Sequence, residues 1–240
     1  MTVKIADGAP RLIVALDVDT PEQALALVDR LGPAVTWYKV GKQLFTRYGP
    51  GPVRELKVRG KRVFLDLKYH DIPNTVAQVV RAAAAIGADM TNVHAAGGGA
   101  MLAAAAQAAG ESGILLVAVT VLTSLDSAAL VETGIEAAPE EQVVRLARLA
   151  AANELAGVVC SAWEIERVRA ACGPDFLLVV PGIRPAGATA GDQKRVMTPG
   201  QAAVAGAHFI VVGRPITQAP DPAAAAQAVR QELGAAAHSR

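Results

Sequence analysis

Short apolar segments alternate with segments of helical periodicity along the whole chain. Eight apolar segments are present within 240 residues. Strands that alternate with helices form parallel sheets, and eight such units in about 250 residues favour closure into a barrel. We therefore predict an α/β fold, a single-domain (β/α)8 TIM barrel over residues 1–240 with its core at about 11–233. The predicted strands are residues 12–16, 37–40, 63–68, 90–94, 114–119, 157–160, 176–180 and 209–212.

Two of the predicted helices begin with a recognisable capping pattern. Thr20-Pro21-Glu22-Gln23 combines an N-cap threonine, a proline at the first helical position and a capping-box glutamine. Thr75-x-x-Gln78 has the same Thr-to-Gln spacing, and we predict that the helix after the third strand begins there.

Composition and charge exclude several classes of function. The formal net charge is +1 and no long run of Lys or Arg occurs, which argues against a nucleic-acid partner or a membrane surface. Residues 1–10 lack a signal-peptide pattern, and no apolar segment reaches the ~20 residues that span a bilayer. Cys160 and Cys172 lack C-x-x-C spacing, so we expect free thiols in a reducing compartment and a cytoplasmic protein.

The third predicted strand ends in a dense group of charges. Residues 66–75 read Asp-Leu-Lys-Tyr-His-Asp-Ile-Pro-Asn-Thr. Because alternate side chains of a strand share a face, Asp66 and Lys68 point the same way, and Asp71 follows in the turn. Such a cluster of charges lowers the stability of the fold, so its presence indicates a functional site. The spacing D-x-K-x-x-D alone is equally consistent with a surface ion pair before a proline turn.

Polar residues also follow the other predicted strands. The active site of a β/α barrel lies at the carboxyl ends of its strands, so these residues are candidates for the site. The Pro- and Gly-rich segment 181–200 is long for a β/α connection, as lids often are. The strand-end candidates are Asp17, Lys39 (with Trp37 and Gly41 on its face), His94, Thr123, Ser124, Arg184, Gly213 and Arg214.

Residues 66–75 closely resemble the active-site signature of the bacterial orotidine 5'-phosphate decarboxylase family, whose members make UMP. The resemblance implies cofactor-free decarboxylation of orotidine 5'-phosphate in pyrimidine biosynthesis. In the family a Lys-Asp-Lys-Asp network surrounds the reacting carbon, and here it would be Lys39, Asp66, Lys68 and Asp71. The resemblance makes Lys68 the proton donor to C6 of the pyrimidine. It also implies a homodimer in which the partner subunit supplies Asp71.

The same resemblance assigns the substrate contacts. It implies that Asp17 and Lys39 hold ribose hydroxyls and that Ser124, beside Thr123, contacts the pyrimidine. The remaining signature residues count as substrate-binding too, although a packing role fits Tyr69 and His70 equally well. These residues are Leu67, Tyr69, His70, Ile72, Pro73, Asn74 and Thr75. The 5'-phosphate would be bound by Gln193, Arg214 and the backbone N–H groups at Gly213 and Arg214, with Arg184 at the start of the loop that carries Gln193.

Two other functions remain open at this point. The keto-gulonate phosphate decarboxylases share D-x-K-x-x-D but use a magnesium-stabilised enediolate, and a degenerate barrel would bind a nucleotide without turnover. Two features oppose the first alternative: residues 72–75, and the lack of an obvious carboxylate other than Asp17 near the ends of the first and second strands. Retention of both lysines and both aspartates opposes the second. The histidines lack zinc-ligand spacing and residues 97–99 lack the P-loop pattern, so we expect no metal or cofactor. A structural role suits His94 better than a catalytic one.

Overall fold

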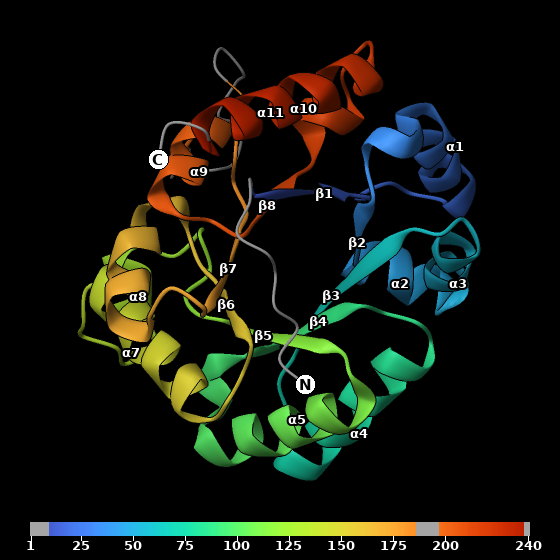
Figure 1. Ribbon diagram of the computed structural model, residues 1–240. Coiled ribbons are helices and arrows are strands. Elements are labelled where there is room, and N and C mark those ends of the chain that lie inside the picture. Colours follow the sequence, from blue (N-terminus) through green and yellow to red (C-terminus); the bar gives the residue numbers. More distant parts are fainter. Residues whose placement is uncertain (1–9, 186–196, 238–240) are drawn as a thin grey trace.

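Eight parallel strands close into a barrel in chain order, which confirms the predicted TIM barrel (Figure 1). The computed structural model describes residues 10–185 and 197–237. Each strand pairs with its sequence neighbours, and β1 pairs with β8 to close the ring. The strands are β1 (Arg11–Ala15), β2 (Trp37–Gly41), β3 (Arg62–Tyr69), β4 (Met90–His94), β5 (Leu115–Val119), β6 (Gly157–Val159), β7 (Leu177–Val180) and β8 (Phe209–Val212).

Helices surround the barrel as an outer ring (Figure 1). None of the helices in the described part of the chain is long and apolar enough to cross a membrane. The helices are α1 (Pro21–Leu31), α2 (Lys42–Tyr48), α3 (Gly51–Val58), α4 (Pro73–Ala85), α5 (Gly99–Ser112), α6 (Ser127–Glu132), α7 (Pro139–Ala152), α8 (Ile165–Cys172), α9 (Pro199–Ala205), α10 (Arg214–Thr217) and α11 (Pro222–Ala237).

The two predicted helix starts differ in outcome. Thr20 is the N-cap of α1, and its Oγ1 accepts a hydrogen bond from the Gln23 N–H. The predicted start at Thr75 is wrong, because α4 begins at Pro73 with Ile72 as the N-cap. Proline at the first helical position has its φ already set and needs no N–H there, so it begins the helix before the capping-box spacing is reached.

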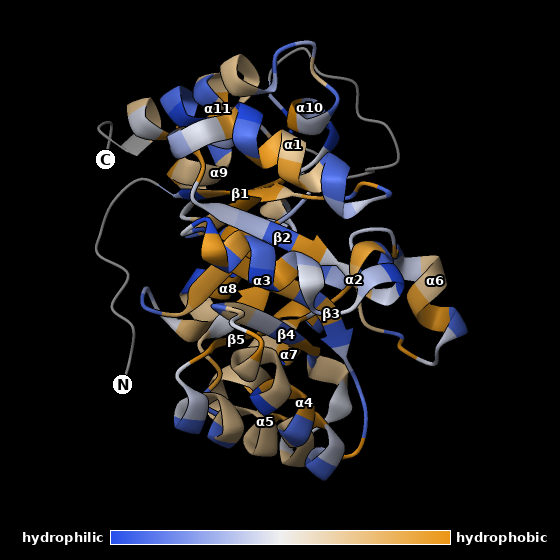
Figure 2. Cartoon of the chain, turned by 90° about the vertical axis from the view of Figure 1, so that its right-hand side faces the viewer, coloured by the Kyte–Doolittle hydropathy of each residue, from blue (hydrophilic) through white to orange (hydrophobic). Residues whose placement is uncertain are grey.

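Apolar side chains fill the barrel below the polar strand ends. In the hydropathy colours of Figure 2, β1 is orange, and the surrounding helices α1, α3 and α11 alternate orange or tan with blue. The rings of Trp37 and Phe209 meet edge to face inside the barrel with centroids 5.3 Å apart. Because side chains alternate along a strand, Lys39 follows Trp37 on the inner face and Asp66 follows Phe64. The inward-facing apolar side chains thus fill the amino-terminal part of the barrel, and the charged side chains lie at the carboxyl ends of the strands.

Candidate active site

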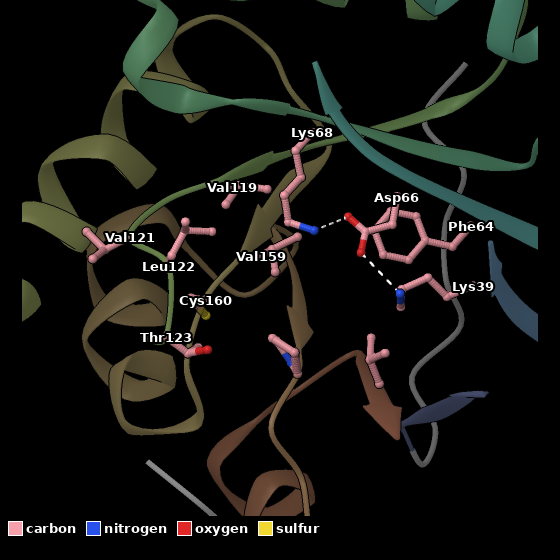
Figure 3. A pocket seen from close by; sticks show the side chains of 12 residues that line it. Lys39, Phe64, Asp66, Lys68, Val119, Val121, Leu122, Thr123, Val159 and Cys160 are labelled. Atoms are coloured by element: carbon pink, nitrogen blue, oxygen red, sulfur yellow. Dashed lines mark hydrogen bonds and ion pairs between the residues drawn. The ribbon is translucent and has the colours of Figure 1, made fainter. Parts of the chain in front are cut away.

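Four charged side chains of alternating sign form a row of ion pairs at the ends of β1, β2 and β3. Lys39 Nζ lies 2.9 Å from Asp17 Oδ1 and 3.5 Å from Asp66 Oδ2. Asp66 Oδ1 in turn lies 2.5 Å from Lys68 Nζ (Figure 3). The structure therefore brings together Asp17, Lys39, Asp66 and Lys68, as the strand-end positions predicted.

The backbone at the end of β3 departs from a regular strand. Lys68 has φ +54°, in the left-handed region, and the pairing with β4 shifts register between Leu65 and Tyr69. Lys68 and Asp66 both line the same cavity, but an irregular strand end, not simple alternation, gives Lys68 its direction. The N–H of Lys68 donates to Asn92 Oδ1 on β4 over 2.8 Å. Sequence reasoning missed Asn92, although a polar residue in the middle of a predicted strand was a signal.

Mutual stabilisation keeps Asp66 and Lys39 ionised. Burial raises the pKa of Asp66, but the adjacent Lys39 and Lys68 outweigh burial and hold that pKa below its ordinary value. Burial lowers the pKa of Lys39, but Asp66 and Asp17 more than compensate, so the pKa lies above its ordinary value. The site therefore presents fixed charges before any ligand arrives.

Gly41 makes room for the Lys39–Asp17 pair. A Cβ at position 41 would lie 3.0 Å from Lys39 Nζ and 3.2 Å from Asp17 Oδ1. A side chain there would require the Lys39 ammonium and the Asp17 carboxylate to shift by a few tenths of an ångström.

The charges border a cavity of about 170 Å³. The charged side chains of Lys39, Asp66 and Lys68 lie on one side of it, and Thr123 lies on the opposite side among apolar residues (Figure 3). The buried Cys160 is a free thiol whose pKa is raised by its burial. The arrangement can hold a flat, partly apolar ring with one edge against an ammonium and a carboxylate. The rest of the lining is Phe64, Val119, Val121, Leu122, Val159, Cys160, Pro181 and Val211.

Comparison with known proteins identifies the family. Residues 10–229 match the family model described as Orotidine 5'-phosphate decarboxylase / HUMPS family. The chain belongs to this family. An orotidine 5'-phosphate decarboxylase of Sodalis glossinidius is 55% identical over 229 residues, which cover 94% of this chain and 90% of the relative. The enzyme of the same name from Moorella thermoacetica is 55% identical over 231 residues, which cover 93% of this chain and 92% of the relative.

A solved structure agrees with these relatives. The crystal structure of orotidine 5'-phosphate decarboxylase from Lactobacillus acidophilus superposes with a TM-score of 0.83 at 40% identity, covering 94% of this chain and 99% of that one. The family resemblance inferred from residues 66–75 is thereby confirmed.

Other residues of the orotidine 5'-phosphate decarboxylase signature lie outside the cavity lining. Asp71 is exposed, and its Oδ1 accepts the N–H of Ile72 over 2.6 Å. Within the described part of one chain, Asp71 is therefore not brought into the Lys39–Asp66–Lys68 cluster. Leu67 and Tyr69 pack against the apolar layer outside the barrel. Also outside the lining are the exposed His70, Ile72, Pro73, Asn74 and Ser124 and the partly buried Thr75.

The histidines near the site contact each other. The rings of His70 and His94 lie 5.6 Å apart. Burial lowers the pKa of His94, and the nearby His70, Lys42 and Lys68 lower it further against the opposing effect of Asp66. A half-buried ring beside a second, tilted ring is consistent with a packing role for His94.

Arg184, which follows β7, lies within electrostatic range of Arg214, which follows β8. Burial, and then the charge of Arg214, lower the pKa of Arg184, and the buried Arg184 Nε has no hydrogen-bond partner among the described residues. Gly213 lies next to Asp17, since a Cβ there would be 3.9 Å from Asp17 Oδ2. Two neighbouring guanidinium groups suit an anion at this position. The predicted phosphate ligand Gln193 lies outside the described residues.

Proposed function

We propose that this protein decarboxylates orotidine 5'-phosphate to UMP and carbon dioxide, a step of pyrimidine biosynthesis, without a cofactor. The proposal depends on the ion pairs that join Lys39, Asp66 and Lys68 at the edge of the cavity. Lys68 Nζ lies 2.5 Å from Asp66 Oδ1. Family membership over residues 10–229 supports the same activity.

The proposed chemistry follows from charge. When the bond from C6 to the carboxylate breaks, its electron pair stays on C6, and no adjacent carbonyl delocalises it. The Lys68 ammonium stabilises that developing charge and then transfers its proton to C6. Asp66 orients Lys68 through their hydrogen bond, and its own charge disfavours the substrate carboxylate in the ground state. Solvent then returns a proton to Lys68.

The proposed substrate contacts distribute the nucleotide over the barrel mouth. Asp17 and Lys39 bind ribose hydroxyls, and Thr123 with Ser124 contacts the pyrimidine. Arg184, Gln193, Arg214 and the N–H groups at Gly213 and Arg214 bind the 5'-phosphate. The proximity of Arg184 to Arg214 and of Gly213 to Asp17 supports this layout. The other proposed substrate-binding residues are the signature members Leu67, Tyr69, His70, Ile72, Pro73, Asn74 and Thr75.

We further propose that the chain is one domain over residues 1–240 and that it acts in the cytoplasm. Free Cys160 and Cys172 support a reducing compartment.

We also propose a homodimer in which each subunit donates Asp71 to the partner's site. The exposure of Asp71, away from its own cluster, supports this arrangement. Mixing inactive Lys68→Ala and Asp71→Ala subunits is expected to restore activity, because one of the two sites of a heterodimer then contains both native residues. The measurement is turnover after proven subunit exchange, and persistent inactivity would rule out a shared site.

Activity is expected to survive exhaustive chelation, because every group proposed to act is an organic side chain. The measurement is the ultraviolet absorbance change of orotidine 5'-phosphate with the native protein, before and after treatment with EDTA. Failure of the untreated protein to change the absorbance would refute the proposed function. A loss on chelation that Mg²⁺ reverses would favour the enediolate chemistry of the keto-gulonate phosphate decarboxylases instead.

A further inference from the structure

Asn92 is a fully buried polar residue inside the barrel. It lies on β4 between Met90 and His94, on the inner face of the strand. A buried carboxamide destabilises the fold unless its donors and acceptors are paired. Asn92 pairs on both sides: its Nδ2 donates to Asp66 Oδ1 over 2.7 Å, and its Oδ1 accepts the N–H of Lys68 over 2.8 Å.

These two partners fix the orientation of the amide. A carboxylate requires a donor and a backbone N–H requires an acceptor, so Nδ2 must face Asp66 and Oδ1 must face Lys68. The carboxamide therefore joins the acidic and the basic member of the ion pair through one rigid group.

The contact to Lys68 lies where the sheet is irregular. Between Leu65 and Tyr69 the β3–β4 register shifts, and Lys68 adopts φ +54°. A lysine in the left-handed region is maintained only when its surroundings fix it. The side chain of Asn92 receives the Lys68 N–H at this point and so holds the backbone from which the Lys68 ammonium extends.

We propose that Asn92 is a positioning residue that fixes the Asp66 carboxylate and the Lys68 backbone together, so that Lys68 Nζ is held at the reacting carbon. This inference rests on the proposed decarboxylase function. Asn92 does not line the cavity, so it acts through its two partners and not through substrate.

Thr91 provides a matched control on the same strand. It is also fully buried, and its Oγ1 donates to the carbonyl of Leu65 on β3 over 2.9 Å. As the neighbouring residue of β4, Thr91 faces away from the barrel interior. Thr91→Val removes a buried hydrogen bond between the same two strands without touching the ion pair.

The test compares Asn92→Ala, Asn92→Asp and Thr91→Val. Asn92→Ala removes both hydrogen bonds. Asn92→Asp has nearly the same shape and keeps an acceptor for the Lys68 N–H, but it places a second negative charge against Asp66. For both Asn92 variants kcat is expected to fall by at least about 100-fold, since small displacements of a reacting group have such effects. The dissociation constant for UMP should change less than about threefold, because the proposed ribose and phosphate contacts do not involve Asn92. Thr91→Val should keep kcat within about twofold even where its melting temperature falls.

A second readout does not depend on turnover. Backbone amide exchange over residues 66–70 is expected to accelerate in Asn92→Ala and to stay as in the native protein in Thr91→Val. If Asn92→Ala does not fold, Asn92→Ser, whose small side chain leaves room for a water molecule, takes its place in both measurements. A kcat within threefold of native in either Asn92 variant, or equal losses in Asn92→Ala and Thr91→Val, would overturn the inference. An inactive native protein would instead refute the proposed function.

Discussion

Lys68→Ala is expected to lower kcat by at least about 10⁴-fold. The substitution removes both the charge that stabilises the carbanion and the acid that protonates it, and each effect alone is worth about 10²-fold or more. The fold should persist, because Asp66 keeps Lys39 and Asn92 as partners. The affinity for UMP should change little, because the proposed ribose and phosphate contacts are made elsewhere. Turnover measured by absorbance and UMP binding measured by calorimetry check both expectations.

Lys57→Ala is the matched control for Lys68→Ala. Lys57 forms a similarly short pair, 2.6 Å from Asp89, which precedes β4 at the amino-terminal end of the barrel. Its removal is expected to affect stability and to leave kcat unchanged. Near-normal turnover in Lys68→Ala would remove this lysine from the mechanism.

The second large effect concerns the phosphate. Orotidine without its 5'-phosphate should be a very poor substrate, and added inorganic phosphite should partly rescue it by occupying the empty phosphate site. Arg214→Ala should raise KM by roughly 10- to 150-fold, the equivalent of one hydrogen bond to a charged group at about 1.5–3 kcal/mol. If phosphate binding also contributes to positioning the other catalytic groups, kcat/KM should fall further than that single contact explains.

Phosphite rescue of orotidine turnover distinguishes phosphate binding by Arg214 from a nonspecific effect of removing one positive charge from the protein. Arg214→Ala should lose most of the rescue. Arg59→Ala, which removes an exposed arginine paired with Glu55 on α3, should retain it. Rescue that is unchanged in Arg214→Ala, or orotidine reacting as well as its 5'-phosphate, would show that this arginine does not recognise phosphate.

The charged site illustrates how far sequence reasoning reaches. Position at a strand end identified Lys39, Asp66 and Lys68, and the structure brings all three to one cavity. Strand alternation, however, did not predict the left-handed backbone of Lys68 or its hydrogen bond to Asn92. Both depend on where the β3–β4 register shifts, and a register shift arises from pairing between two segments.

The arginines show the same limit over a longer distance. Arg184 and Arg214 follow different strands, and only the family resemblance, not the local pattern, assigned both to the phosphate end of the site. The effect of the Arg214 charge on the pKa of Arg184 requires a closeness that only the pairing of β7 with β8 decides. The position of Asp71 is likewise a tertiary result: its spacing suggested the cluster, but the turn before α4 leaves it exposed.

The sequence by itself determined the eight-unit barrel, the strand ends that carry charge and the family signature of residues 66–75. These properties are local, because apolar periodicity and residue order act within one segment of chain. The tertiary structure alone decided the Asn92 bridge, the direction of Lys68 and the approach of Arg184 to Arg214. Each of these depends on the register or closure between segments distant in sequence, which no single segment's pattern encodes.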